Sequence, residues 1–172
     1  MSTATLQAPE FTATERRRGG KYLTFSLGSE SYGLAILKVR EIIGLMQITA
    51  VPRAASYVRG VINLRGQVIT VIDLRAKFGM MGVEKTDQTC IIVVETSLAG
   101  RKMNTGVIVD RVLEVVEIPA ERIEDAPNLG DGESDKFILG MGKIGERVAI
   151  LLDIDHVLGG DRLMSEQIPL SN

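Results

Sequence analysis

Short runs of Val, Ile and Leu fill the middle of this chain and leave almost no room for long helices. The chain has 16 Val and 17 Ile among 172 residues, and Gly residues separate the runs. Helical periodicity is confined to two stretches of about one turn, Arg75 to Phe78 and Asp155 to Leu158. Many short strands with few helices indicate closed or sandwiched antiparallel sheets. The runs that carry this prediction are Leu23 to Leu27, Val68 to Leu74, Ile91 to Val94, Val107 to Val109 and Val148 to Ile154.

Two segments of the chain recur in the same order, which indicates an internal duplication. Residues 68–79 align without a gap on residues 148–159 at an offset of 80, and residues 33–42 align on residues 106–115 at an offset of 73. Val/Ile-rich strands can also resemble one another by chance. A shared Asp after the apolar run and shared corner glycines favour duplication. Each unit would have about 60–75 residues and five strands, the size of a small β-barrel that leaves no open sheet edge.

Composition limits the class of protein further. Hydrophobic residues make up 45% and charged residues 24%, the balance of a soluble globular protein. With one Cys and one His, the chain has too few ligands for a disulfide framework, a thiolate zinc site or a multi-His metal centre. No apolar run reaches the roughly 18 residues that span a bilayer, and the first twenty residues lack the core of a signal peptide. A cytoplasmic protein with no metal and no cofactor is therefore expected.

Charge is unevenly distributed along the chain. The net charge of −2 argues against binding to nucleic acid. Residues 21–85 carry a net charge of +5, whereas residues 86–160 carry −7. We read residues 1–20, which end in an Arg16 to Arg18 run, as a mobile tail, and residues 161–172 as a second tail. Three arginines beside two Glu make only a weak patch for anionic lipid or nucleic acid.

The motif Gly140-Met-Gly142-Lys-Ile-Gly145 matches the dinucleotide pattern G-x-G-x-x-G. A nucleotide site needs a helix after this motif, because the N-terminus of that helix binds the pyrophosphate. Here the most strand-like stretch of the chain, residues 147–154, follows instead. The motif is therefore interpreted as a hairpin turn. P-loop, H-E-x-x-H, G-x-S-x-G and EF-hand patterns are absent from the sequence.

The remaining reactive side chains favour structural roles. Cys90 begins an apolar strand and is expected to be a buried small hydrophobe. His156 is expected at a helix end or facing solvent. Asp73 and Asp153 recur where a strand enters a helical turn, which is typical of helix N-caps rather than acid–base catalysts. The acidic residues between 121 and 135 are interrupted by Pro127 and several Gly, so a solvated loop is favoured over a calcium site.

One set of motifs resembles a known family. The segments are residues 32–42 (YGLAILKVREI), Val51-Pro52, residues 57–66 (YVRGVINLRG) and residues 71–75 (VIDLR). Together they resemble the CheW family of bacterial chemotaxis adaptors, from about Lys21 to Gly159. The resemblance implies an all-β fold of two SH3-like five-stranded β-barrels related by duplication. It implies a single CheW-like domain over residues 21–160, with interleaved subdomains of approximately 21–85 and 86–160.

The resemblance also implies a function and a site. CheW-type proteins are non-enzymatic adaptors that couple the cytoplasmic tips of transmembrane chemoreceptors to the histidine kinase CheA in signalling arrays. This chain would then be cytoplasmic and recruited to the inner face of the membrane through those arrays, without inserting into the bilayer. By residue-wise carry-over, the partner-binding positions are Val39, Glu41, Gly60, Arg65, Gly66 and Gly106.

Two expectations concern charge. Glu41 is the natural partner of Arg65, so an ion pair is predicted at the junction of the barrels, either as a structural bridge or as part of a partner contact. A basic first half and an acidic second half would suit a head-to-tail contact, with the kinase or with a second copy, that closes into rings. One departure from the family is local: Ala55 stands where a second Pro often follows Pro52.

Two alternatives remain open at the level of sequence. The chain could be a regulatory module of another chemosensory pathway, with pilus motility or another output, or of a larger regulator or kinase. The free ends at Met1 and Asn172 and the lack of receiver or ATPase motifs favour a stand-alone adaptor. The second alternative is an enzyme that binds a nucleotide at residues 140–145.

Overall fold

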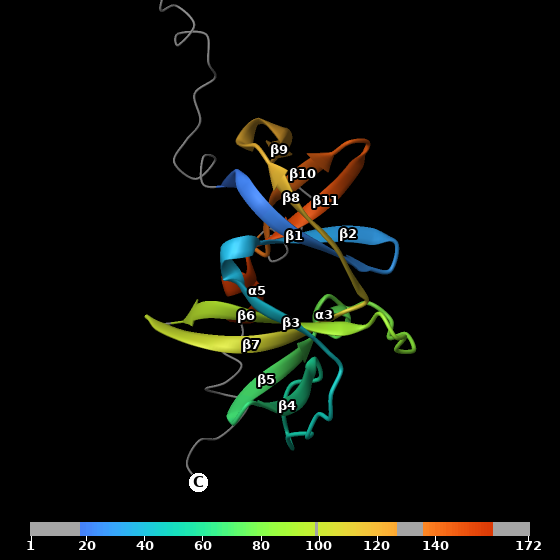
Figure 1. The fold of residues 1–172 in the computed structure, drawn as a ribbon, viewed down its shortest axis with the longest axis vertical. Helices are drawn as coiled ribbons and strands as arrows, with labels where there is room; N and C mark the ends of the chain where they lie inside the picture. Colours follow the sequence, from blue (N-terminus) through green and yellow to red (C-terminus); the bar gives the residue numbers. More distant parts are fainter. Residues whose placement is uncertain (1–17, 99, 127–135, 160–172) are drawn as a thin grey trace, which may run out of the picture.

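A computed structural model of the chain describes residues 18–98, 100–126 and 136–159. The described part consists of eleven strands and a few short helices (Figure 1). The strands are β1 (Gly20–Leu27), β2 (Glu30–Ala35), β3 (Val39–Gly44), β4 (Val58–Leu64), β5 (Gln67–Asp73), β6 (Cys90–Leu98), β7 (Arg101–Val109), β8 (Arg111–Ile118), β9 (Ile123–Glu124), β10 (Ile138–Ile144) and β11 (Arg147–Leu152). The helices are η1 (Ile36–Lys38), α3 (Leu74–Lys77), η2 (Ala120–Arg122) and α5 (Ile154–Gly159).

The strands form two sheets that curl into small barrels. One sheet has the order β3-β6-β7-β5-β4, called here the five-strand barrel, and the other has the order β8-β1-β2-β11-β10-β9, called the six-strand barrel. In the five-strand barrel the chain beyond β3 returns to β4, where the backbones of Thr49 and Val61 exchange two hydrogen bonds of 2.8 and 2.9 Å. In the six-strand barrel β9 pairs with β10 at the equivalent place. The predicted all-β architecture is confirmed.

The duplication is visible in the strand order. Offsets of 73 and 80 place β2 on β7, β3 on β8 and β5 on β11, and these strands hold the same positions in the two sheets. Each repeat gives a hairpin to one barrel and its remaining strands to the other. The hairpins join through the parallel pairs β2–β11 and β5–β7. A division of the chain near residue 85 therefore does not separate the barrels, because each approximate half supplies strands to both.

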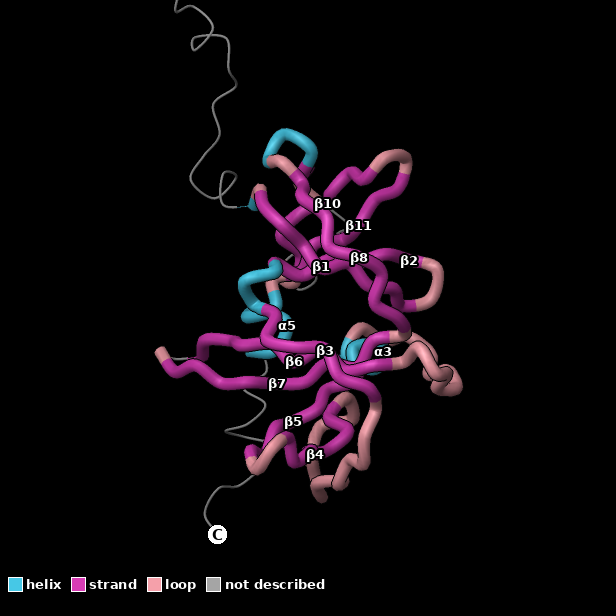
Figure 2. Tube along the Cα trace, viewed as in Figure 1, coloured by secondary structure: helices cyan, strands magenta, loops and turns pink. Residues whose placement is uncertain are grey.

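The largest core lies between the barrels. Fifteen buried apolar side chains, including Phe25, Ile72 and Leu152, come from both sheets and from the two helices. Smaller cores of six and five buried residues fill the five-strand and six-strand barrels. Figure 2 shows α3 and α5 in the layer between the barrels. Because each barrel buries one face against the other, the two behave as a single folding unit.

The expected helix caps are present at the barrel interface. Asp73 caps α3 by accepting backbone N–H bonds from Arg75 and Ala76. Asp153 accepts the backbone N–H of His156 at 3.3 Å, and the His156 ring Nδ1 lies 2.7 Å from the other oxygen of Asp153. His156 is thus a helix-end residue, as predicted.

Other sequence-based expectations also have structural outcomes. Gly140 and Gly142 lie within β10 and Gly145 lies in the β10–β11 turn, so the glycine motif forms a hairpin. Cys90 is partly buried against the inter-barrel core, and this burial raises the pKa of its thiol.

Both tails and much of the acidic loop lie outside the described residues, but Arg18, placed in the expected N-terminal tail, is buried at the end of the six-strand barrel. Its Nη1 donates to Asp125 and to the carbonyl of Leu139, at 2.8 and 3.0 Å.

Candidate site at the mouth of the five-strand barrel

The β4–β5 turn projects a basic side chain from the mouth of the five-strand barrel. Arg65 and Gly66 form this turn, with φ angles of 51° and 89°. Two successive positive φ angles suit a tight hairpin, and Gly66 adopts this conformation without steric cost. The Asn63 side chain accepts the Gly66 N–H at 2.8 Å and fixes the turn. Arg65 has a left-handed backbone, which is sterically unfavourable for a residue with a Cβ. Because the turn is fixed, the Arg65 side chain extends toward solvent from a rigid support.

Glu41 and Arg65 form the predicted ion pair. The Arg65 guanidinium donates to Glu41, and this hydrogen bond raises the pKa of Arg65. Glu41 lies on β3 and Arg65 follows β4, the two outer strands of this sheet. The pair thus closes the mouth of one barrel, whereas it was expected at the junction of the two. Arg65 keeps 68% of its side chain exposed and Glu41 keeps 32%, so both are open to a partner.

A cavity of about 300 Å³ lies at this mouth. Its wall is mostly polar, and Arg40 on this wall forms a second ion pair with the neighbouring Glu95, in which Arg40 Nη1 lies 3.4 Å from Glu95 Oε1. Gln67 and Asn104 line the same space. With two acidic and two basic side chains, the mouth is internally neutralised and offers hydrogen-bonding groups in both senses.

Two of the six carried-over residues are packing glycines. Gly60 has a φ of 142°, and a Cβ there would lie 2.0 Å from the Thr49 carbonyl oxygen. A Cβ on Gly106 would lie 2.7 Å from a methyl carbon of Ile91 inside the barrel. Both positions exclude a larger side chain because neighbouring atoms occupy its space. They support the shape of the barrel and do not present a group to a partner.

The carried-over residues thus divide into three groups, one of which is the pair of packing glycines. Glu41, Arg65 and Gly66 gather at the barrel mouth, whereas Val39 packs against the inter-barrel core at the start of β3. Arg40, Gln67 and Asn104 complete the mouth and were not among the expected residues. The alternation of apolar and polar residues could have indicated Arg40 on β3 and Gln67 on β5. Asn104 could not be found in this way, because sequence alone does not show that β7 lies beside β5. The register Thr70 opposite Thr105 places Asn104 at this end of the barrel.

Comparison with known proteins places the chain in a family. The family model of the CheW-like domain matches residues 21–162. The chain belongs to the CheW-like family. It is 38% identical over 145 residues to the chemotaxis protein CheW of Klebsiella aerogenes, which covers 84% of this chain and 85% of that protein. It is 33% identical over 144 residues to CheW of Bacillus subtilis, covering 84% and 90%.

A solved CheW structure has the same fold. The scaffolding protein TtCheW of Thermoanaerobacter tengcongensis superposes with a TM-score of 0.71 at 35% identity, over 81% of this chain and 92% of that one. The chain is accordingly a non-enzymatic scaffold of the chemotaxis type. Among the described residues, none of the helices is long and apolar enough to cross a membrane. The same part of the chain holds no group of three or more His, Cys, Asp or Glu side chains arranged for a metal.

Proposed function

We propose that this CheW-like protein couples chemoreceptors to a CheA-type histidine kinase, with the mouth of the five-strand barrel as a contact surface. The Glu41–Arg65 pair carries the proposal. It combines an exposed guanidinium, a fixed turn and an acceptor carboxylate in one small area. Charged groups on rigid supports give an interface its register and specificity. In this proposal the protein is cytoplasmic and reaches the membrane through its receptors.

The other carried-over residues act through the shape of this surface. Gly60 lets the chain from β3 return to β4, and Gly106 lets β7 pack closely inside the same barrel. Val39 anchors the start of β3 to the inter-barrel core, two residues before Glu41. Changes at these positions would disturb coupling by moving the mouth, without removing a direct contact.

Charge also suits head-to-tail assembly. Grouped by barrel, residues 39–109 hold nine Lys/Arg and five Asp/Glu, whereas residues 18–38 with 110–159 hold eight and thirteen. The opposite signs therefore survive the interleaving of the strands. We propose that a basic barrel of one molecule meets an acidic barrel of the kinase or of a second copy, in contacts that close into rings. Assembly is expected to weaken as salt rises, and assembly that is insensitive to salt would count against this contact.

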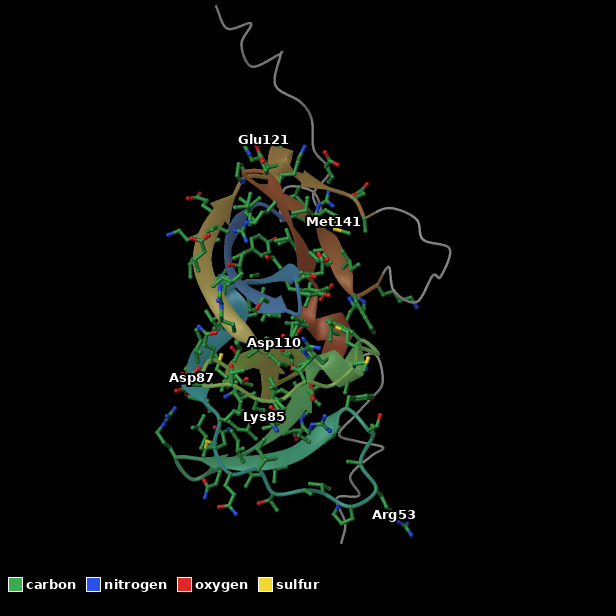
Figure 3. All side chains as sticks on the ribbon, turned by 90° about the vertical axis from the view of Figure 1, so that its right-hand side faces the viewer. Arg53, Lys85, Asp87, Asp110, Glu121 and Met141 are labelled. Carbon is green, nitrogen blue, oxygen red and sulfur yellow. The ribbon has the colours of Figure 1, made fainter. Side chains whose placement is uncertain are left out.

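The coupling proposal is tested with Arg65→Ala. The substitution removes the guanidinium and keeps a Cβ, so the turn retains its backbone demands. We expect the variant to fold normally and to lose most of the receptor-dependent control of kinase activity in a reconstituted mixture. Arg53→Ala is the matched control, because Arg53, labelled in Figure 3, also has a left-handed conformation but precedes β4, whereas Arg65 follows this strand. Normal control of the kinase by a folded Arg65→Ala protein would reject the role of this mouth.

A further inference from the structure

A second polar cavity, of about 560 Å³, opens between the mouth of the six-strand barrel, α3 and the loop that leads to β6. Asp110, near the centre of Figure 3, lies on its wall between the two barrels. Arg111 and Arg147 line the cavity from β8 and β11. Ser26 and Ser31 line it from β1 and β2, the two strands that lie between the arginine-bearing strands.

The strand register places three of these residues, Arg111, Ser26 and Ser31, in one row, and Arg147 lies two positions before Ala149, the β11 partner of Ser31. Arg111 is opposite Ser26, and Ser26 is opposite Ser31. Directly opposed residues in antiparallel strands project from the same face of the sheet. On the far side of the row, Arg147 Nη1 lies 3.3 Å from Ser31 Oγ. Two hydroxyl groups are thus flanked by two guanidinium groups, a set of donors that suits an oxyanion.

The duplicated barrel shows that an arginine at position 147 is not required by the fold. An offset of 80 places Arg147 on Gln67, which has no charge. The strand pairs Ser26–Ser31 and Glu95–Asn104 are equivalent, so an acidic residue of the five-strand barrel is replaced here by a serine. In the six-strand barrel Ser26 takes the place of Glu95 and Arg147 takes the place of Gln67, while Glu114 keeps the acidic position of Glu41.

Arg111 also differs from its equivalent in the other repeat, because it has no acidic partner on the neighbouring helix. Its equivalent in the other repeat, Lys38, pairs with Asp155 of α5 at 2.7 Å. The position equivalent to Asp155 on α3 is Arg75, a basic residue. The Arg111 side chain is exposed and makes no hydrogen bond or ion pair with any part of the chain that the structure describes.

The other charged groups at the cavity leave the two arginines accessible. Arg75 is fully engaged, because it donates to Asp110 through two nitrogens at 2.8 and 2.7 Å and to the Met81 carbonyl through the third. Arg147 forms a long ion pair with Glu114, in which Nη2 lies 3.7 Å from Oε2, beyond hydrogen-bond distance, and 53% of the Arg147 side chain is exposed. Glu84, on the loop, is the remaining acidic residue of the lining and opposes an anion.

We infer that this cavity binds a phosphate-type oxyanion, held by Arg111 and Arg147 with the Ser26 and Ser31 hydroxyls between them. The volume leaves room for more than the anionic group, so either free phosphate or a phosphorylated side chain supplies the same chemistry. The site lies on the six-strand barrel, apart from the mouth proposed for coupling. Its occupancy therefore does not depend on the proposed function.

The test is a titration of the full-length protein with sodium phosphate at neutral pH, followed by amide NMR at constant ionic strength. We expect saturable shifts centred on the amides of Ser26 and Ser31. Arg147→Gln, which installs the residue of the other repeat, and Arg111→Gln should each weaken binding by about tenfold or more. Glu84→Gln should strengthen binding, and Arg53→Gln, remote from the cavity, should leave it unchanged.

Phosphoserine, titrated in parallel, distinguishes the two sources. Tighter binding of phosphoserine than of phosphate would indicate a phosphorylated side chain, and equal binding would indicate free phosphate. The inference is overturned if the shifts do not saturate, or if folded Arg111→Gln and Arg147→Gln proteins bind phosphate as the natural protein does. Thermal unfolding of each variant shows that it is folded.

Discussion

The backbone at position 60 makes two demands, on its φ angle and on the space for a Cβ, that only glycine can meet. The Gly60 φ of 142° lies in a region that L side chains rarely adopt, and the Thr49 carbonyl occupies the place of a Cβ. The same residue lies at the irregularity of the β4–β5 ladder, which falls between Val58 and Gly60. Gly140, its equivalent in the second repeat, also has no space for a Cβ, because atoms of Ile123 and Glu124 would lie within 3 Å. The glycine is a condition for closing the barrel.

Gly60→Ala is therefore expected to destabilise the protein by about 3 kcal/mol or more, from backbone strain and overlap with Thr49 together. Coupling to partners would be lost in proportion to unfolding. Gly44→Ala is the control, because nothing lies within 4 Å of its Cβ position and its φ is ordinary. Urea denaturation measures both. A Gly60→Ala protein as stable as the natural one, yet unable to couple, would instead place Gly60 in a direct contact.

Two ion pairs fasten the short helices at the barrel interface to the segments where the chain crosses between barrels. On one side Arg75 of α3 binds Asp110, which also accepts the N–H of Gly28 in the β1–β2 turn at 2.7 Å. On the other side Asp155 of α5 binds Lys38 of η1 and accepts the N–H of Ser97. The repeats thus keep a similar arrangement with the charges exchanged, although Asp110 lies one position before Arg111, the equivalent of Lys38.

The Arg75 guanidinium lowers the pKa of Asp110, mainly by hydrogen bonding. Because the folded-state pKa is below that of the unfolded chain, this stabilisation is complete above about pH 4 and is lost as the pH falls through the folded value. Asp110→Asn should cost about 1–2 kcal/mol at neutral pH and progressively less in acid. Chemical denaturation over a pH series, with Asp87→Asn in the exposed loop as control, measures this. A difference that persists unchanged at the lowest pH would contradict the assignment.

Local features of the elements were accessible from sequence. Alternation and β-branched composition indicated the strands, and the recurring Asp73 and Asp153 indicated the starts of α3 and α5. Interleaving of the subdomains was implied only by the family resemblance. The residues themselves did not indicate it, because parallel pairing of β5 with β7 joins residues more than thirty positions apart with no local signal. The opposite charges of Glu41 and Arg65 predicted that the two side chains form an ion pair. These charges could not show that the pair closes one barrel.

At the scale of the whole molecule, the two barrels share their largest core and present different mouths. Fifteen buried residues hold the barrels together, so the relative placement of the mouths is fixed by packing. One mouth carries the Glu41–Arg65 and Arg40–Glu95 pairs, and the other carries Arg111 and Arg147 around two serines. A rigid body with two chemically distinct ends suits a scaffold, which acts by holding its partners at fixed positions.

The central claim is that a folded surface, the mouth of the five-strand barrel, joins the kinase to receptors. Co-sedimentation of a CheA-type kinase with receptor-containing membranes tests it directly. The natural protein is expected to carry the kinase into the pellet, and a folded Glu41→Gln/Arg65→Ala double variant is expected to leave most of it in the supernatant. Equal amounts of kinase in the pellet with the natural and double-variant proteins would contradict the account. So would kinase in the pellet when neither protein is added.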